Sequence, residues 1–118
     1  MKKILIVDDS GLSRNILKKL IGVGSIEFLE ASEGFAALEL FSVHQPDLVT
    51  LDLNMSGMNG YEVLENFRKI NPATPIIVCS ADIQQGTRDL VLKMGAKGFI
   101  SKPFKQDDIS NMIDQFIK

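Results

Sequence analysis

The chain alternates between short apolar runs rich in β-forming residues and segments with helical periodicity, and this alternation restricts the fold more than any other feature. Four of the five runs are apolar almost throughout, which is typical of strands covered on both faces. The predicted strands are residues 3–8, 26–31, 47–52, 75–80 and 98–102. Between and after them, apolar residues recur at a spacing near 3.6. The predicted helices are residues 11–22, 33–44, 60–70, 83–94 and 105–117.

Strands and helices in strict alternation, joined by right-handed crossovers, give a parallel sheet with helices on both faces. Five strands are too few for a closed eight-stranded barrel. We therefore expect an α/β fold, an open doubly wound five-stranded parallel sheet of order 2-1-3-4-5 with five helices, flavodoxin-like. The 118 residues fit a single domain over 1–118.

Charge and composition exclude several classes of protein. The net charge of −2 offers no basic surface for nucleic acid, and no apolar run is long enough to span a membrane. The N-terminal stretch "MKKILIVDD" is too short for a signal peptide, so a cytoplasmic location is expected. The single cysteine, Cys79, is interpreted as a buried thiol, and His44 as a helix-end residue rather than a metal ligand.

Polar side chains stand at the ends of four predicted strands. Asp8 and Asp9 end the first, Asp52 the third, Ser80 the fourth and Lys102 the fifth. Ligands of open parallel sheets bind outside the carboxyl ends of the strands, near the point where the strand order reverses. We therefore expect these side chains to gather at one edge of the sheet.

Three carboxylates and one ammonium give this edge a formal charge of −2. Two like charges about 4 Å apart repel by about 4 kcal/mol at an effective dielectric constant of about 20. Oxygen ligands without a nearby His or Cys favour Mg²⁺, with Mn²⁺ or Ca²⁺ as substitutes. Since Mg²⁺ commonly bridges to phosphate, and a carboxylate such as Asp52 can attack a phosphoryl group, the pattern indicates phosphoryl transfer.

These residues lie in motifs that resemble the receiver domains of two-component response regulators, over essentially the whole chain. The motifs are "VDDS", "LDLNMSGMNG" around Asp52, "CSA" and "GFISKPF". By this resemblance, Asp52 is the phosphoacceptor and Asp9 ligates Mg²⁺ directly. Asp8 would assist through water, and the backbone carbonyl of Asn54 would supply a further ligand.

The resemblance also implies a switch. Ser80 would move toward the phosphorylated Asp52, and Phe99 would turn inward, which changes the face built from the fourth helix, fifth strand and fifth helix. Phe99 stands where the family often has Tyr, so its movement is expected to depend on packing alone. Lys102 would contact the phosphoryl group, and its bond to Pro103 would be cis.

Several positions qualify this interpretation. Asn54 and Asp82 occupy positions that tune phosphoryl lifetime, and an amide with an acid there resembles the chemotaxis type. Ser56 and Asn59 depart from the family's Pro and Asp. Gly86 indicates either a loosely held fourth helix, because an internal glycine costs about 1 kcal/mol against alanine, or a helix that starts later.

The expected function is that of a single-domain response regulator, because no output domain follows Lys118. A histidine kinase would be the phosphodonor. The target would be a flagellar motor switch component or, alternatively, a relay phosphotransfer protein. The chain is expected to be a monomer that catalyses only its own phosphorylation and autodephosphorylation.

Three alternative classes fit the residues less well. An aspartyl-phosphate hydrolase would need a "DxD" nucleophile after the first strand, where this chain has "VDDSG". A flavodoxin-type flavin carrier would need a phosphate-binding loop there, and two aspartates would repel the anion. A degenerate receiver that only binds partners conflicts with the intact acidic set.

Overall fold

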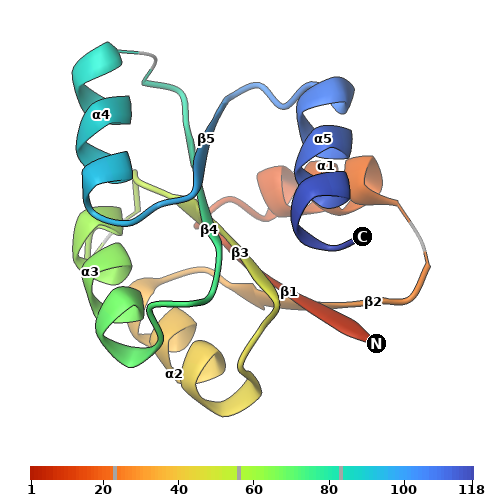
Figure 1. Ribbon diagram of the computed structural model, residues 1–118, viewed down its shortest axis with the longest axis horizontal. Coiled ribbons are helices and arrows are strands. Elements are labelled where there is room, and N and C mark those ends of the chain that lie inside the picture. The colour runs from red at the N-terminus through yellow and green to blue at the C-terminus, as the bar shows by residue number, and fades with distance from the viewer. Residues whose placement is uncertain (23, 56, 83) are drawn as a thin grey trace.

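The computed structural model describes residues 1–22, 24–55, 57–82 and 84–118. Within these residues, five strands and five helices alternate as predicted. The strands form one sheet, and Figure 1 shows the helices around it. The strands are β1 (Lys2–Val7), β2 (Ile26–Ala31), β3 (Leu48–Asp52), β4 (Ile76–Ser80) and β5 (Gly98–Ser101). The helices are α1 (Gly11–Ile21), α2 (Gly34–His44), α3 (Gly60–Ile70), α4 (Gln85–Lys93) and α5 (Gln106–Phe116).

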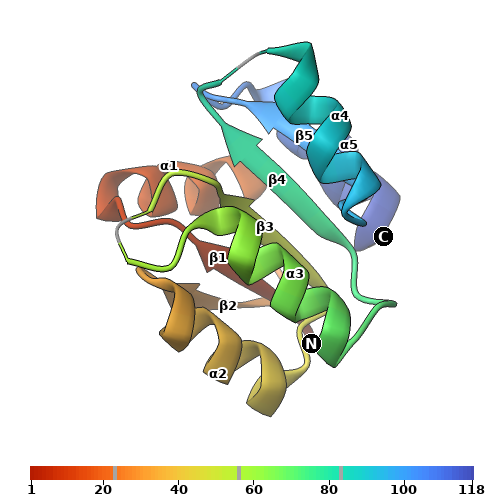
Figure 2. The same ribbon diagram turned by 90° about the vertical axis from the view of Figure 1, so that its left-hand side faces the viewer.

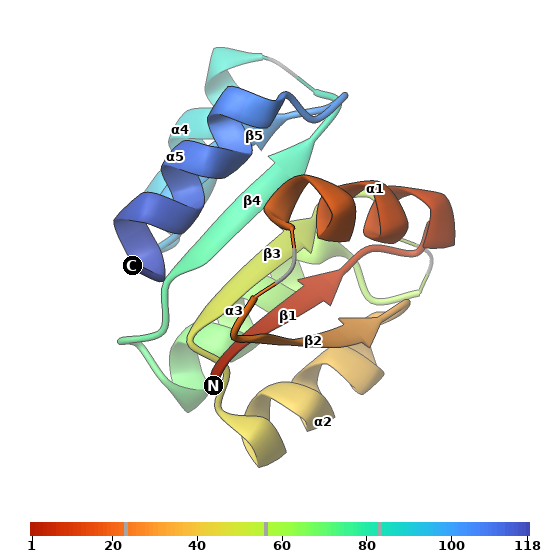
Figure 3. The same cartoon turned by 90° about the vertical axis from the view of Figure 1, so that its right-hand side faces the viewer.

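The sheet is parallel with strand order β2-β1-β3-β4-β5, so the predicted fold class is confirmed. Helices α2, α3 and α4 cover one face (Figure 2), and α1 and α5 cover the other (Figure 3). Strand residues alternate between two cores. Leu5 and Val7 enter the core under α2–α4, whereas Ile4 and Ile6 enter the core under α1 and α5. None of the described helices is long and apolar enough to cross a membrane.

Local signals in the sequence set several helix ends. Asn59 and Glu62 form a capping pair at the start of α3, because Asn59 Oδ1 accepts the Glu62 N–H and Asn59 Nδ2 donates to Glu62 Oε1, both at 3.0 Å. Gly22 ends α1 with φ of 91°, and Gly95 follows α4 with φ of 104°, backbone conformations that suit glycine. His44 is the last residue of α2, as predicted.

Several strand and helix boundaries differ from prediction by one or two residues, and three of them bear on the site. Asp8 and Lys102 lie one residue beyond the ends of β1 and β5, which frees both side chains from the sheet and lets them turn toward each other. The predicted start of the fourth helix, residue 83, lies outside the described residues, as does Ser56. Helix α4 begins at Gln85, so Gly86 lies in its first turn. The later start is therefore correct, and Gly86 gives no evidence of a loosely held helix.

Candidate metal centre

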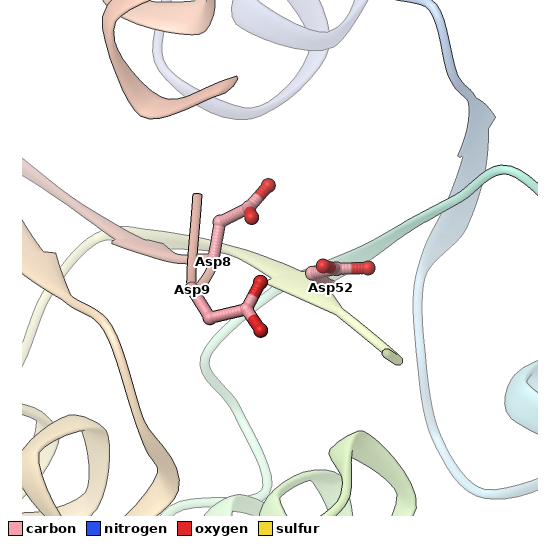
Figure 4. Close-up of side chains that lie close together, drawn as sticks. All are labelled: Asp8, Asp9 and Asp52. Carbon is pink, nitrogen blue, oxygen red and sulfur yellow. The ribbon is translucent and has the colours of Figure 1, made fainter. Parts of the chain in front are cut away.

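Three carboxylates meet at the carboxyl edge of the central strands. One carboxylate oxygen from each of Asp8, Asp9 and Asp52 lies within 4.8 Å of the other two. Figure 4 shows the three side chains close together. Val7 pairs with Leu51, which brings the residues after β1 beside the end of β3. Asp8 and Asp52 are only 4% and 5% exposed, whereas Asp9 is exposed. The predicted gathering of these side chains is confirmed.

The Asp8 carboxylate is occupied by two donors within the protein. Oδ1 accepts the backbone N–H of Ser10 at 3.0 Å, and Oδ2 accepts Lys102 Nζ at 2.7 Å. Within the part of the chain that the structure describes, the exposed Asp9 carboxylate has no hydrogen bond. Asp9 is therefore the carboxylate most free to bind a cation directly, which agrees with the roles that the resemblance implies for Asp9 and Asp8.

The Asp52 carboxylate has favourable polar contacts, but it is also buried. Its Oδ1 accepts the Asn54 N–H at 3.2 Å, and its Oδ2 lies 3.4 Å from Lys102 Nζ. Burial raises the pKa of Asp52 above its ordinary value, and the charge of Asp8 adds to this rise. The Asn54 N–H and the Lys102 charge oppose it without cancelling it. A bound cation would relieve the remaining cost of ionising Asp52.

Lys102 brings a positive charge to the cluster. Burial acts to lower its pKa, but the hydrogen bond to Asp8 and the charge of Asp52 outweigh burial, and the pKa is raised. Lys102 is thus an ammonium at neutral pH, and the four side chains keep a formal charge of −2. The donor set, the short oxygen separations and this charge all fit one hard dication such as Mg²⁺. The ligand role of the Asn54 carbonyl stays a prediction.

The two predicted switch residues, Ser80 and Phe99, lie on the neighbouring strands β4 and β5. Ser80 ends β4 fully buried, and its Oγ accepts the Asp82 N–H at 3.0 Å. Phe99 packs half-buried against the core under α2–α4. The Arg88 guanidinium lies 5.5 Å from the centre of the Phe99 ring. This cation–π contact adds an electrostatic interaction to the packing of Phe99, whose movement on phosphorylation stays a prediction.

The Asp82 carboxylate accepts two hydrogen bonds from residues at the start of α4. Its two oxygens accept the Gln84 N–H at 3.0 Å and the Thr87 hydroxyl at 2.7 Å. The Gln84 N–H, and then Thr87, lower the pKa of Asp82. Asp82 therefore connects the residues at the start of α4 to Ser80, and its tuning of phosphoryl lifetime remains a prediction.

Two further sequence expectations are met. The Lys102–Pro103 bond is cis. Cys79 is fully buried in register with Asp52, and burial raises the pKa of its thiol to about 12. Such a thiol is unreactive in the folded protein, as its interpretation as a core residue requires.

Sequence reasoning missed three residues that support the site. Gly60 begins α3 against the end of β3, where a Cβ would lie 2.5 Å from Leu53 Cα and 2.8 Å from the Asp52 carbonyl oxygen. A glycine directly after the loop that follows Asp52 was the available signal for this close approach. Arg14 and Glu30 form an ion pair beside Asp8, at 3.0 Å between Nε and Oε1, for which the sequence carried no local signal.

The fold and the acidic site define the class of protein. Residues 4–114 match the family described as the response regulator receiver domain, and the chain belongs to this family. The resemblance drawn from the motifs is thereby confirmed. Receiver domains of this type are signalling proteins.

Within the family, the chain is similar to stand-alone chemotaxis regulators. It is 39% identical over 118 residues to the chemotaxis protein CheY of Thermotoga maritima, covering 99% of this chain and 98% of that protein. It is 38% identical to CheY of Bacillus subtilis, covering 96% and 95%. A solved CheX-CheY-BeF₃-Mg²⁺ complex from Borrelia burgdorferi matches with a TM-score of 0.88 and 28% identity, covering 99% of this chain and 90% of that one.

Proposed function

We propose that residues 1–118 form a single-domain response regulator that accepts a phosphoryl group on Asp52 from a phosphohistidine of a kinase. The observation that carries the proposal is the buried Asp52 carboxylate, which lies against two further carboxylates and 3.4 Å from the Lys102 ammonium. Full-length similarity to CheY proteins supports a role in chemotaxis or motility signalling.

In the transfer, an Asp52 oxygen attacks phosphorus, the N–P bond of the donor breaks and an O–P bond forms. Asp8, Asp9, Asp52 and the Asn54 carbonyl would hold Mg²⁺, which supplies charge neutralisation at the phosphoryl oxygens. Lys102 exchanges part of its contact with Asp52 for a phosphoryl oxygen. The Borrelia complex contains CheY together with BeF₃ and Mg²⁺, and this supports a similar site here.

Phosphorylation adds charge and strong acceptor oxygens at Asp52, and the Ser80 hydroxyl would donate to one of them. Movement of Ser80 disturbs the hydrogen bond that its Oγ accepts from the Asp82 N–H. Because Asp82 contacts residues at the start of α4, the movement would change the position of this helix end. Phe99 would then turn inward from the Arg88 guanidinium. A cavity of about 250 Å³, lined by Arg88, Lys97 and Phe99 among others, opens on the face of α4, β5 and α5. This face is the proposed site for the target.

The first experiment is phosphorylation by a small acyl- or amido-phosphate in Mg²⁺, followed by intact mass. We expect one labile phosphate that is absent with chelator and absent in Asp52→Asn, but present in Asp114→Asn, an exposed control. Absence of phosphate from the wild-type protein would overturn the proposal. Continuous release of alcohol from phosphate esters would instead indicate a hydrolase, and a yellow chromophore a flavin carrier.

A second experiment distinguishes the two signalling roles. The phosphorylated protein is mixed with a flagellar motor switch component or with a histidine phosphotransfer protein. Binding to the first without transfer supports the chemotaxis role. Loss of phosphate from Asp52 with gain on the histidine supports the phosphorelay alternative. The monomeric state and the cytoplasmic location stay predictions from the sequence.

A further inference from the structure

We propose that Arg14 and Glu30 form a positioning pair for the metal carboxylates. Arg14 fixes the peptide between Asp8 and Asp9, and Glu30 holds Arg14 in place. The pair thereby sets the affinity of the site for a divalent cation. The inference rests on the proposed function, since it assumes that the acidic cluster binds Mg²⁺.

The contacts of Arg14 join helix α1, strand β2 and the acidic loop. Arg14 Nη1 donates to the backbone carbonyl of Asp8 at 2.6 Å, and Arg14 Nε donates to Glu30 Oε1 at 3.0 Å. The other Glu30 oxygen accepts Lys18 Nζ at 2.8 Å. Glu30 is thus anchored by two residues of α1, and the planar Arg14 fork spans the distance from β2 to the backbone of Asp8.

Both backbone groups of Asp8 are therefore held from the end of β2. Its N–H donates to the Ala31 carbonyl at 3.0 Å, and its carbonyl accepts from Arg14, which Glu30 holds. That carbonyl belongs to the peptide joining Asp8 to Asp9. Because the Asp9 carboxylate has no hydrogen bond within the described residues, the orientation of this peptide decides where Asp9 points.

The direction in which Mg²⁺ affinity changes when Arg14 is removed distinguishes a positioning role from a purely electrostatic one. Arg14 is a cation beside three carboxylates, so as a charge alone it weakens the binding of a dication, and its removal would tighten binding. As a positioning residue it keeps Asp9 aimed at the ion, and its removal weakens binding. Outer residues that orient metal ligands commonly change metal affinity about tenfold or more.

The experiment measures the Mg²⁺ dissociation constant of the full chain by calorimetry, with amide chemical shifts of Asp9 and Asn54 as a second readout. We expect Arg14→Gln to weaken binding about tenfold. Arg14→Lys, which keeps the charge but loses the fork, weakens it in the same direction. Glu30→Gln acts through Arg14, so the double variant binds no more weakly than Arg14→Gln alone.

Two controls separate this effect from charge and from stability. Lys19→Gln removes one positive charge from the exposed surface of α1 and is expected to leave the affinity unchanged or slightly tighter. Ile109→Val destabilises the buried core under α1 and α5, and is expected to leave Mg²⁺ affinity of the folded protein unchanged.

Unchanged or tighter Mg²⁺ binding in Arg14→Gln overturns the positioning role. If Arg14→Gln does not fold, Arg14→Lys and Glu30→Gln provide the test. Unchanged Mg²⁺ affinity in both of these variants overturns the positioning role. A wild-type protein that binds no Mg²⁺ contradicts the proposed metal site itself, and wild-type binding with unaffected variants contradicts only the role of Arg14 and Glu30.

Discussion

Lys102 and Asp8 lie 94 positions apart in the sequence, yet Lys102 Nζ and Asp8 Oδ2 form an ion pair of 2.7 Å. The side chains are 19% and 5% exposed, so the pair is largely shielded from water. The same ammonium lies 3.4 Å from Asp52. Lys102 therefore makes two adjacent buried carboxylates tolerable when no cation is bound.

Lys102→Met is expected to lower the free energy of unfolding by about 3 kcal/mol at pH 7 without Mg²⁺, because it leaves buried charge uncompensated. Saturating Mg²⁺ is expected to restore part of this loss. Urea unfolding with and without Mg²⁺ measures both effects. The matched control is Lys69→Met, whose exposed pair with Glu65 spans 3.7 Å and contributes about 0.3 kcal/mol. Equal losses in the two variants would contradict the compensating role of Lys102.

Asp52→Asn is expected to raise the free energy of unfolding without Mg²⁺ by up to about 1 kcal/mol. The amide removes a buried charge that lies beside Asp8 and Asp9. The same change is expected to reduce the stabilisation that Mg²⁺ gives. Urea unfolding in chelator and in Mg²⁺ tests this, and an Asp52→Asn protein less stable than wild type in chelator would contradict the stated cost of ionising Asp52.

The pH dependence follows from the raised pKa of Asp52. The folded protein holds the Asp52 proton more tightly than the unfolded chain does, so ionisation of Asp52 destabilises the fold. The stability of the wild type relative to Asp52→Asn is therefore expected to fall as the pH rises from about 3.8 through the folded pKa, and to be constant above it. Unfolding of both proteins from pH 3 to 7 in chelator measures this. If wild type instead became more stable relative to Asp52→Asn as the pH rose over this range, the pKa of Asp52 would be lowered rather than raised by folding.

Gly60→Ala is expected to lower the free energy of unfolding by about 2 kcal/mol, because the new Cβ would overlap the backbone of Leu53 and Asp52. It is also expected to slow phosphorylation by a small donor, since the end of β3 must shift. The matched variant is Gly86→Ala. Apart from its chain neighbours and the backbone of its own helix, no heavy atom of the described residues lies within 4 Å of the place that the new methyl group would take, and about 0.5 kcal/mol of stabilisation is expected. Similar effects of the two substitutions would show that the close approach at Gly60 is unimportant.

Arg88→Met is expected to favour the inward orientation of Phe99 before phosphorylation, because it removes a cation–π contact of about 0.5–1 kcal/mol. That free energy corresponds to a change of about two- to fivefold in the population ratio. Ring resonances of Phe99 would move toward their phosphorylated positions, and Arg88→Lys, which keeps the charge, would show a smaller movement. Identical ring resonances in wild type and Arg88→Met would remove Arg88 from the proposed switch.

The sheet and its acidic edge were accessible from the sequence because both depend on short-range patterns. Apolar runs mark the strands, periodicity marks the helices, and parallel strands carry their final residues to one edge. Asp8, Asp9 and Asp52 could therefore be placed together from the sequence. The motifs then added the roles of Ser80 and Lys102, which strand ends alone would not have assigned.

Contacts that depend on side-chain reach were not accessible in this way. Arg14 and Glu30 are 16 residues apart on different elements, and only the packed structure brings the guanidinium to the edge of β2. The start of α4 was also missed, because Asp82 holds the residues before this helix through the Gln84 N–H and the Thr87 hydroxyl, and apolar periodicity does not reveal such contacts. The Arg88 contact with Phe99 likewise requires α4 to be docked beside β5.

The use of the first and last strands to complete one pocket has a consequence for biosynthesis. Asp8 is synthesised 94 residues before Lys102, whose ammonium pairs with it in the folded protein. A nascent chain that stops short of Lys102 therefore carries both aspartates without the ammonium that pairs with Asp8 in the folded protein. The acidic pocket can be completed only after Lys102 has been synthesised.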